Sequence, residues 1–106
     1  MREPIIVHIE PDIADLVPGF LANRQRDVES LRTLLEQGDF TAIRIIGHSM
    51  KGAGGGYGFD HITDLGAGIE NAALDGDRRA IDMLTSELAE YLACVQPVTL
   101  DPDTAA

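Results

Sequence analysis

The spacing of apolar residues constrains this chain more than any other feature. In four segments the apolar residues recur at steps of three and four, which is the period of one face of an α-helix. The second segment shows the spacing most clearly, with Ile43, Ile46, Met50, Ala53 and Tyr57. The 106 residues suit one domain, and the pattern predicts four amphipathic helices around a single core.

Turn residues mark where these helices are expected to end. Gln37-Gly38-Asp39 and Asp75-Gly76-Asp77 each place a glycine, which accepts the left-handed conformation after a helix, before an aspartate that can cap the next helix. Asp60 is expected to cap the third long helix in the same way. Such short corners join antiparallel neighbours, so we predict an all-α fold: an antiparallel up-down-up-down four-helix bundle with a short N-terminal helix over 11–17.

The two ends of the chain differ from the bundle in composition. Residues 5–9 are β-branched and apolar apart from His8, but no second strand is visible for them. Residues 97–106 are short, acidic and interrupted by proline. We therefore expect an extended N-terminal segment over 1–10, the bundle over 11–96, and a flexible acidic tail over 97–106.

Charge and cysteine content exclude several classes of protein. The formal net charge of −10 repels nucleic acids and anionic membrane surfaces. Cys94 is the only cysteine, so no disulfide can form within the chain. No apolar run is long enough to span a membrane or to serve as a signal peptide. The composition favours a cytoplasmic protein, and we expect a monomer.

His48 lies opposite the apolar face of the second helix. Its side of the helix also carries Thr41, Arg44, Lys51, Gly52 and Gly55. A lone histidine is more often structural, but Lys51 is the only lysine of the chain and no acidic residue occurs between positions 39 and 60. This local positive charge suits an imidazole that takes up an anionic phosphoryl group.

The glycines around this helix have two interpretations. Gly52 lies one turn after His48 on the same face, where a missing side chain would let a partner approach the ring. Close packing between helices is the alternative, preferred for Gly54 and Gly47. The run does not match a nucleotide-binding loop, and a metal-binding bundle lacks convergent ligands because His48 and His61 are thirteen residues apart.

The run His48-Ser49-Met50-Lys51-Gly52, followed by Gly58, resembles the His-x-x-Lys-Gly-x5-Gly signature of histidine-containing phosphotransfer (HPt) domains. Residues 35–39 and 65–73 also resemble HPt sequences, so the resemblance covers most of the chain. It implies that His48 accepts the phosphoryl group, that Lys51 supports it electrostatically, and that Gly52 gives steric access. Gly58 is then structural.

The resemblance also implies a function and partners. The chain would be a phosphorelay carrier, not an enzyme, that accepts a phosphoryl group from a receiver-domain aspartyl-phosphate and passes it to another receiver in two-component signal transduction. Its partners would be response-regulator receiver domains and a hybrid histidine kinase. It would need no cofactor of its own, because the receiver supplies Mg²⁺. The alternative is a non-phosphorylated helical docking module that inhibits a receiver or kinase.

Partner recognition is expected on the helix face around His48. Arg44, Ile45 and Gly55 are the partner-binding residues predicted there, and Ile45 is the best of the apolar candidates because it falls outside the buried arc. Further candidates come from the first long helix: Phe20, Leu21 and Arg24. The simplest interpretation of Glu70 and Asn71 is that they are solvated residues.

Overall fold

The computed structural model describes residues 3–100, and it is mostly helical. A 3-10 helix, Pro11–Leu16, leads into α1 (Val17–Gln37), and the remaining long helices are α2 (Phe40–Gly54), α3 (Asp60–Leu74) and α4 (Arg78–Cys94). A second 3-10 helix, Gly55–Tyr57, follows α2. The four helices and the short N-terminal helix confirm the prediction of a helical bundle.

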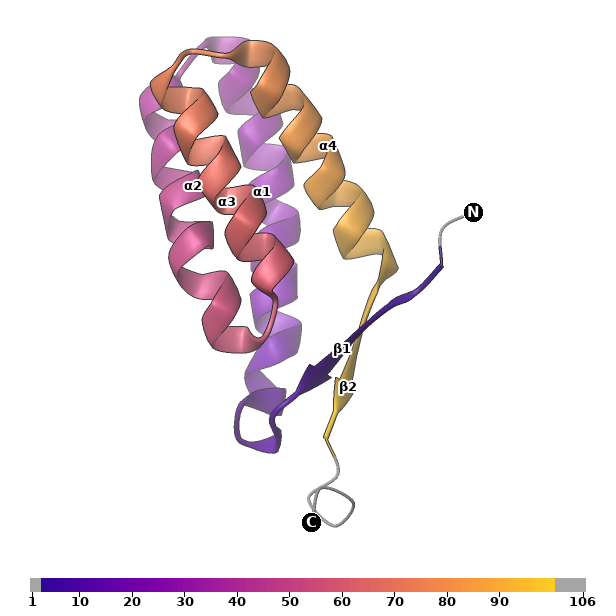
Figure 1. Ribbon diagram of the computed structural model, residues 1–106. Helices are drawn as coiled ribbons and strands as arrows, with labels where there is room; N and C mark the ends of the chain where they lie inside the picture. The colour runs from indigo at the N-terminus through magenta and orange to yellow at the C-terminus, as the bar shows by residue number, and fades with distance from the viewer. Residues whose placement is uncertain (1–2, 101–106) are drawn as a thin grey trace.

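Both predicted glycine–aspartate corners form as expected. Gly38 ends α1 in the left-handed conformation (φ 70°), and the Asp39 side chain accepts a hydrogen bond of 3.1 Å from Ala42 N. Gly76 is also left-handed (φ 65°), and Asp77 caps α4 in the same way. Figure 1 shows these two corners at one end of the bundle and the turn between α2 and α3 at the other.

The third helix begins differently from the prediction. Phe59, not Asp60, occupies the position before α3, and the helix has no side-chain cap. The Phe59 side chain is fully buried, while its carbonyl accepts the first helical hydrogen bond, from Ile62 N at 2.9 Å. Burial of this ring therefore fixes the start of α3, and Asp60 becomes the first residue inside the helix.

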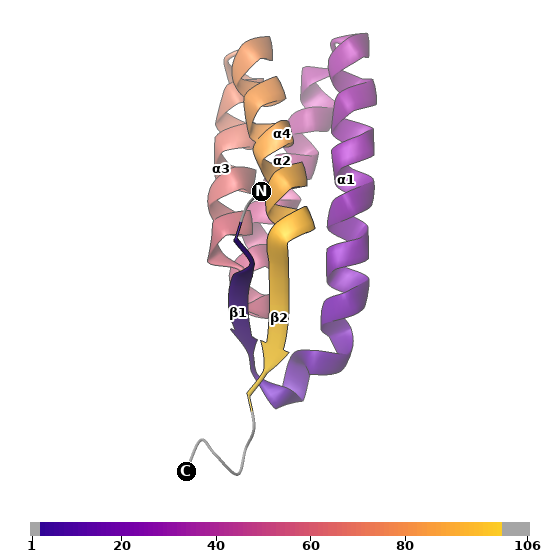
Figure 2. The ribbon, with the colours of Figure 1, turned by 90° about the vertical axis from the view of Figure 1, so that its right-hand side faces the viewer.

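Two strands correct the prediction that the fold is all-α. β1 (Ile5–Ile9) pairs in parallel with β2 (Val95–Thr99), which continues directly from α4 (Figure 2). The expected flexible tail is thus wrong for residues 97–99, and residues 101–106 lie outside the described residues. Leu100 N donates a hydrogen bond to Ile9 O, so its N–H points toward β1. Backbone N–H groups point to alternate edges along a strand, so the nitrogen of Pro97, three residues earlier, points to the unpaired edge of β2. The missing N–H of this proline therefore removes no hydrogen bond from the strand pair.

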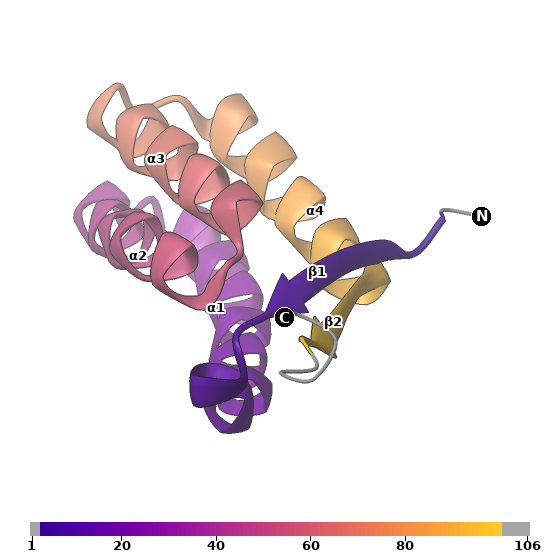
Figure 3. The ribbon, with the colours of Figure 1, turned by 60° about the horizontal axis from the view of Figure 1, so that its bottom comes forward.

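The strand pair closes the end of the bundle that holds the turn between α2 and α3. Figure 3 shows β1 passing beside this turn, and Ile9 is buried in the core. The core beneath it contains an aromatic group in which the Phe20 ring stacks on Tyr57 at 4.4 Å and on Phe59 at 5.5 Å between centroids. These contacts hold α1 against the end of α2 and the start of α3.

Candidate functional site

His48 projects from the middle of α2 into solvent. Ile43 and Met50 on the opposite side of the helix are fully buried and anchor α2 to the core. The side chain of His48 is 67% exposed. The helix therefore presents the imidazole outward, as its spacing from the apolar residues predicts.

Glu70 of α3 connects His48 to Lys51. Its Oε2 lies 2.7 Å from His48 Nδ1, and its Oε1 accepts a hydrogen bond of 2.7 Å from Lys51 Nζ. The Glu70 side chain is only 13% exposed, compared with 41% for Lys51. The interpretation of Glu70 as a merely solvated residue is therefore wrong, because its carboxylate is the centre of a three-residue cluster.

This cluster also changes the expected electrostatics. The sequence shows no acidic residue on α2 near Lys51, but α3 supplies one, so the positive charge of Lys51 is already paired. Hydrogen bonds from Lys51, and then from His48, hold the pKa of the Glu70 carboxyl below its usual value. The site is close to electroneutral rather than cationic.

The ionised carboxylate determines the state of the imidazole. A carboxylate can only accept hydrogen bonds, so the contact of 2.7 Å requires a proton on Nδ1 of His48. In a neutral imidazole this leaves the lone pair on Nε2. The arrangement thus offers Nε2 as a nucleophile toward an incoming electrophile.

Two glycines bring Glu70 within reach of α2. A Cβ on Gly47 would lie 2.7 Å from Glu70 N, and a Cβ on Gly66 would lie 2.5 Å from Lys51 N. Neither distance is compatible with a side chain, so α2 and α3 pack through bare backbone at this level. Gly54 behaves similarly, with Thr63 N at 2.6 Å, which confirms the packing role preferred for Gly47 and Gly54.

Gly52 differs from Gly47, Gly54 and Gly66, because there is open space where its Cβ would lie. A Cβ at this position would meet nothing within 4 Å. Packing against the described residues therefore does not explain this glycine, and clearance beside His48 stays a prediction. Gly55 is also exposed, and a Cβ there would make only ordinary contacts of 3.7 Å, with side-chain oxygens of Asp60 and Thr63.

The residues predicted to bind a partner separate into two groups. On α2, Ile45 is 57% exposed, as expected, and Arg44 is half-buried. On α1 the prediction fails for Phe20, which is 6% exposed and stacked in the aromatic core. Arg24 is also unsuitable, because its side chain is 11% exposed, lies over the Phe20 ring and pairs with Asp27 at 2.8 Å.

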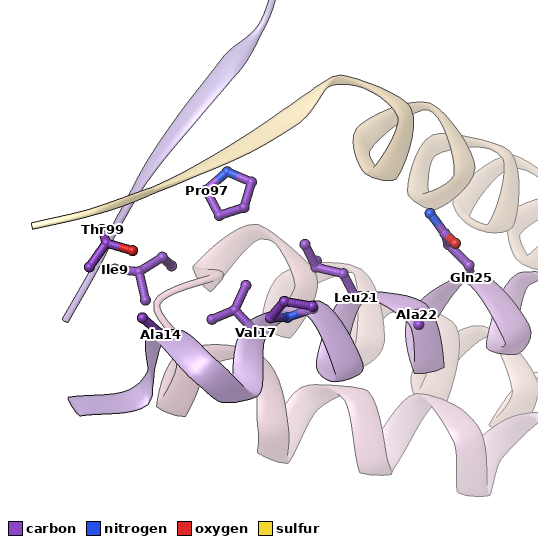
Figure 4. Close-up of a pocket in the computed structure, with 9 residues that line it drawn as sticks. Ile9, Ala14, Val17, Leu21, Ala22, Gln25, Pro97 and Thr99 are labelled. Carbon is purple, nitrogen blue, oxygen red and sulfur yellow. The ribbon is translucent and has the colours of Figure 1, made fainter. Parts of the chain in front are cut away.

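Leu21 faces a different part of the surface. It is half-buried and borders a hollow of about 460 Å³ between α1 and β2, together with Val17 and Pro97 (Figure 4). No residue of α2 or α3 lines this hollow. It is therefore separate from the cluster around His48.

The remaining histidine of the bundle, His61, lies in the first turn of α3. His61 packs its ring against Tyr91 and lies 3.8 Å from a carboxylate oxygen of Glu87. Burial raises the pKa of the Tyr91 hydroxyl, and the nearby Asp60 adds to this effect. Among residues 3–100, no group of three or more His, Cys, Asp or Glu side chains is placed to hold a metal ion.

Comparison with known families agrees with the site. A family model described as Hpt domain matches residues 15–94, which is most of the chain and includes every residue of the cluster. The chain belongs to this family. Hpt domains carry phosphoryl groups in phosphorelay signalling, are not autonomous enzymes, and interact with receiver domains and histidine kinases.

Other comparisons add nothing further. No curated protein and no solved structure gives a significant match. No described helix of this Hpt domain combines the length and the apolar character that crossing a membrane requires.

Glu70 is the site residue that the sequence interpretation missed. The relevant signal is a repeated spacing: Gly47 precedes Lys51 by four residues on α2, and Gly66 precedes Glu70 by four on α3. Residues four apart share a helix face, so each glycine lies beside a charged residue on the side where the helices meet. Two such pairs on consecutive helices indicate a close crossing with an ion pair next to it.

Proposed function

We propose that this chain accepts a phosphoryl group on Nε2 of His48 from the aspartyl-phosphate of one receiver domain and passes it to the aspartate of another. The observation that carries the proposal is the contact of 2.7 Å between Nδ1 and Glu70 on a ring that is otherwise 67% exposed. The contact orients the ring, and the exposure leaves room for a partner's active site.

Each residue around the ring has a distinct part in this proposal. The Nε2 lone pair attacks phosphorus as the bond to the aspartyl oxygen breaks, with no need for a separate base. Lys51, whose side chain is 41% exposed, keeps its hydrogen bond to Glu70, and its other N–H groups point toward the phosphoryl oxygens and offset part of their charge. Gly52 leaves clearance for the receiver, which supplies Mg²⁺ and its own acidic residues, so the chain itself needs no cofactor.

The receiver would dock on the exposed side of α2. Ile45 provides apolar surface one turn before His48, Arg44 provides charge, and Gly55 extends the bare surface toward the end of the helix. A hybrid histidine kinase, through its own receiver domain, is the proposed source of the phosphoryl group.

The test is transfer from a phosphorylated receiver domain to the purified chain. We expect a label that is lost in acid and stable in base, present in the unsubstituted chain and absent from His48→Gln. His61→Gln is the matched control, because it removes another exposed histidine and should keep the label. Binding of the receiver without any label on the unsubstituted chain would instead support an inhibitory docking module.

A further inference from the structure

A phosphoryl carrier must release the group that it has accepted, and the carboxylate of Glu70 contacts the ring from which the group leaves. Both oxygens of this carboxylate are engaged, one by Nδ1 of His48 and one by Lys51. The inference below rests on the proposed function, since it concerns the phosphorylated form of the same ring.

Acceptance of the phosphoryl group creates a positive charge on the ring. The ring enters as a neutral imidazole with its proton on Nδ1. The Nε2 lone pair forms the N–P bond, and the electron pair of the broken O–P bond remains on the aspartate of the receiver. No proton has moved, so the product is a phosphoimidazolium that still carries hydrogen on Nδ1.

The fate of this Nδ1 proton decides whether the group can be passed on. If the proton is lost, departure of the phosphoryl group must expel an imidazolate anion, which is a very poor leaving group. If the proton stays, the N–P electron pair returns to Nε2 and the leaving group is a neutral imidazole. Donation therefore depends on the protonated form of the ring.

We propose that Glu70 holds the proton on Nδ1 of phosphorylated His48 and so keeps the phosphohistidine competent to donate its phosphoryl group. Loss of the proton would leave a nitrogen lone pair facing a carboxylate oxygen at 2.7 Å, which is electrostatically unfavourable. The protonated ring instead forms a charge-assisted hydrogen bond with the same oxygen.

Lys51 supports this role from the other side. Its hydrogen bond to Oε1 favours the ionised form of Glu70, which is the form that stabilises a cationic ring. In the described part of the chain, the charged groups in contact with Glu70 are Lys51 and His48, both from α2. Arg44, one turn before His48, is the next positive charge on that helix. Glu70 is thus a positioning residue that acts through His48, not through contact with the phosphoryl group.

The experiment measures the pH dependence of donation. The full chain and its Glu70→Gln variant are phosphorylated on His48, and the rate of transfer to a receiver domain is followed from acid to alkaline pH. Glutamine keeps the size of the side chain and an oxygen for Nδ1, but removes the negative charge. We expect the pH at which donation slows to fall by about one unit in Glu70→Gln, the usual effect of losing an adjacent opposite charge.

The donation rates of the two proteins should differ at alkaline pH only. At acid pH both rings are protonated and the rates agree, whereas above both midpoints Glu70→Gln donates about tenfold more slowly. Glu87→Gln is the matched control, because it removes a carboxylate beside His61, and its curve should coincide with that of the unsubstituted chain. A purely structural role of Glu70 would lower the rate equally at every pH.

Outcomes that overturn the inference are distinct from failure of the proposed function. Equal midpoints for the two proteins, with His48 labelled in both, overturn the role of Glu70 and leave the carrier function intact. No label on His48 in the unsubstituted chain overturns both. Nitrogen NMR of the phosphorylated, unsubstituted chain gives an answer even when the variant does not fold: at about pH 7, above the ordinary value of about 6.5 for imidazole, most Nδ1 atoms should still carry hydrogen, and a mostly unprotonated Nδ1 overturns the inference.

Discussion

Replacing Gly47 by alanine tests whether the contact between α2 and α3 is as close as the site requires. The new Cβ would lie 2.7 Å from Glu70 N and 2.8 Å from Gly66 O. Both are backbone atoms of α3, so no side-chain rotation can relieve the overlap. A Cβ in ordinary van der Waals contact lies at least about 3.4 Å from the nearest atom, compared with 2.7 Å here. The backbone of α3 must therefore move away from α2 by about 0.7 Å.

The expected loss of stability follows from two opposing terms. Overpacking a well-packed contact costs about 1–3 kcal/mol, while alanine recovers about 0.5–1 kcal/mol of helix propensity relative to glycine. The net destabilisation of Gly47→Ala should lie between about 0 and 2.5 kcal/mol, with about 1 kcal/mol in the middle of the range, and each 1 kcal/mol corresponds to a decrease in Tm of roughly 4–8 °C for a domain of this size.

Urea unfolding followed by circular dichroism measures this difference, and two variants serve as controls. Gly52→Ala lies on the same helix with nothing within 4 Å, so it should gain stability by about 0.5–1 kcal/mol. Gly54→Ala meets Thr63 N at 2.6 Å, away from the cluster, so it should lose stability without displacing Glu70. Phosphoryl transfer should slow in Gly47→Ala more than in Gly54→Ala. Equal stability of Gly47→Ala and Gly52→Ala would refute the packing described here.

Three further predictions concern Ile45, Arg78 and Glu70. Ile45→Asp should slow transfer from a receiver about 5- to 30-fold without loss of helicity. Met83→Asp is the control on α4, where the native side chain has a similar exposure, and it should not slow transfer; equal rates for the two variants would remove Ile45 from the interface. Arg78→Ala removes a hydrogen bond of 2.9 Å to Leu35 O and should lower the free energy of unfolding in urea by about 1 kcal/mol. An unchanged urea midpoint would contradict this prediction. The pKa of Glu70 in the folded chain lies below its ordinary value of 4.5. The ionised carboxylate therefore stabilises the fold above pH 4.5, and this stabilisation is lost as the pH falls through the pKa of the folded state. Glu70→Gln should consequently weaken the dependence of Tm on acid pH.

Features encoded by neighbouring residues could be predicted from the sequence. The four helices follow from apolar residues spaced three and four apart, and the corners at Gly38 and Gly76 follow from a glycine that tolerates a positive φ. The outward direction of His48 and the exposure of Ile45 follow from the same helical period. Each of these conclusions needs only residues within one or two turns of each other.

Features that depend on distant segments could not be predicted in this way. β2 is a five-residue strand whose partner lies at the other end of the chain, and Pro97 argues against a strand until the alternation shows that it faces the free edge. The same reason explains Phe20, because a helical period alone does not show that two aromatic residues from the turn between α2 and α3 cover its ring. Glu70 belongs to this class too, since its contact with His48 spans 22 positions of the chain.

The glycines that set the spacing of α2 and α3 also decide whether the chemistry of His48 is available. Glu70 reaches His48 and Lys51 only because Gly47 and Gly66 let the two backbones meet, and neither glycine belongs to the run from His48 to Gly52 by which the family resemblance is first noticed. A chain that keeps that run but carries larger residues at both glycines would hold its helices farther apart. Its histidine would then be exposed but not oriented, and its lysine would have no carboxylate to pair with. In the proposed transfer the signature supplies the histidine, and the close helix contact beside it places Glu70 where it orients the imidazole.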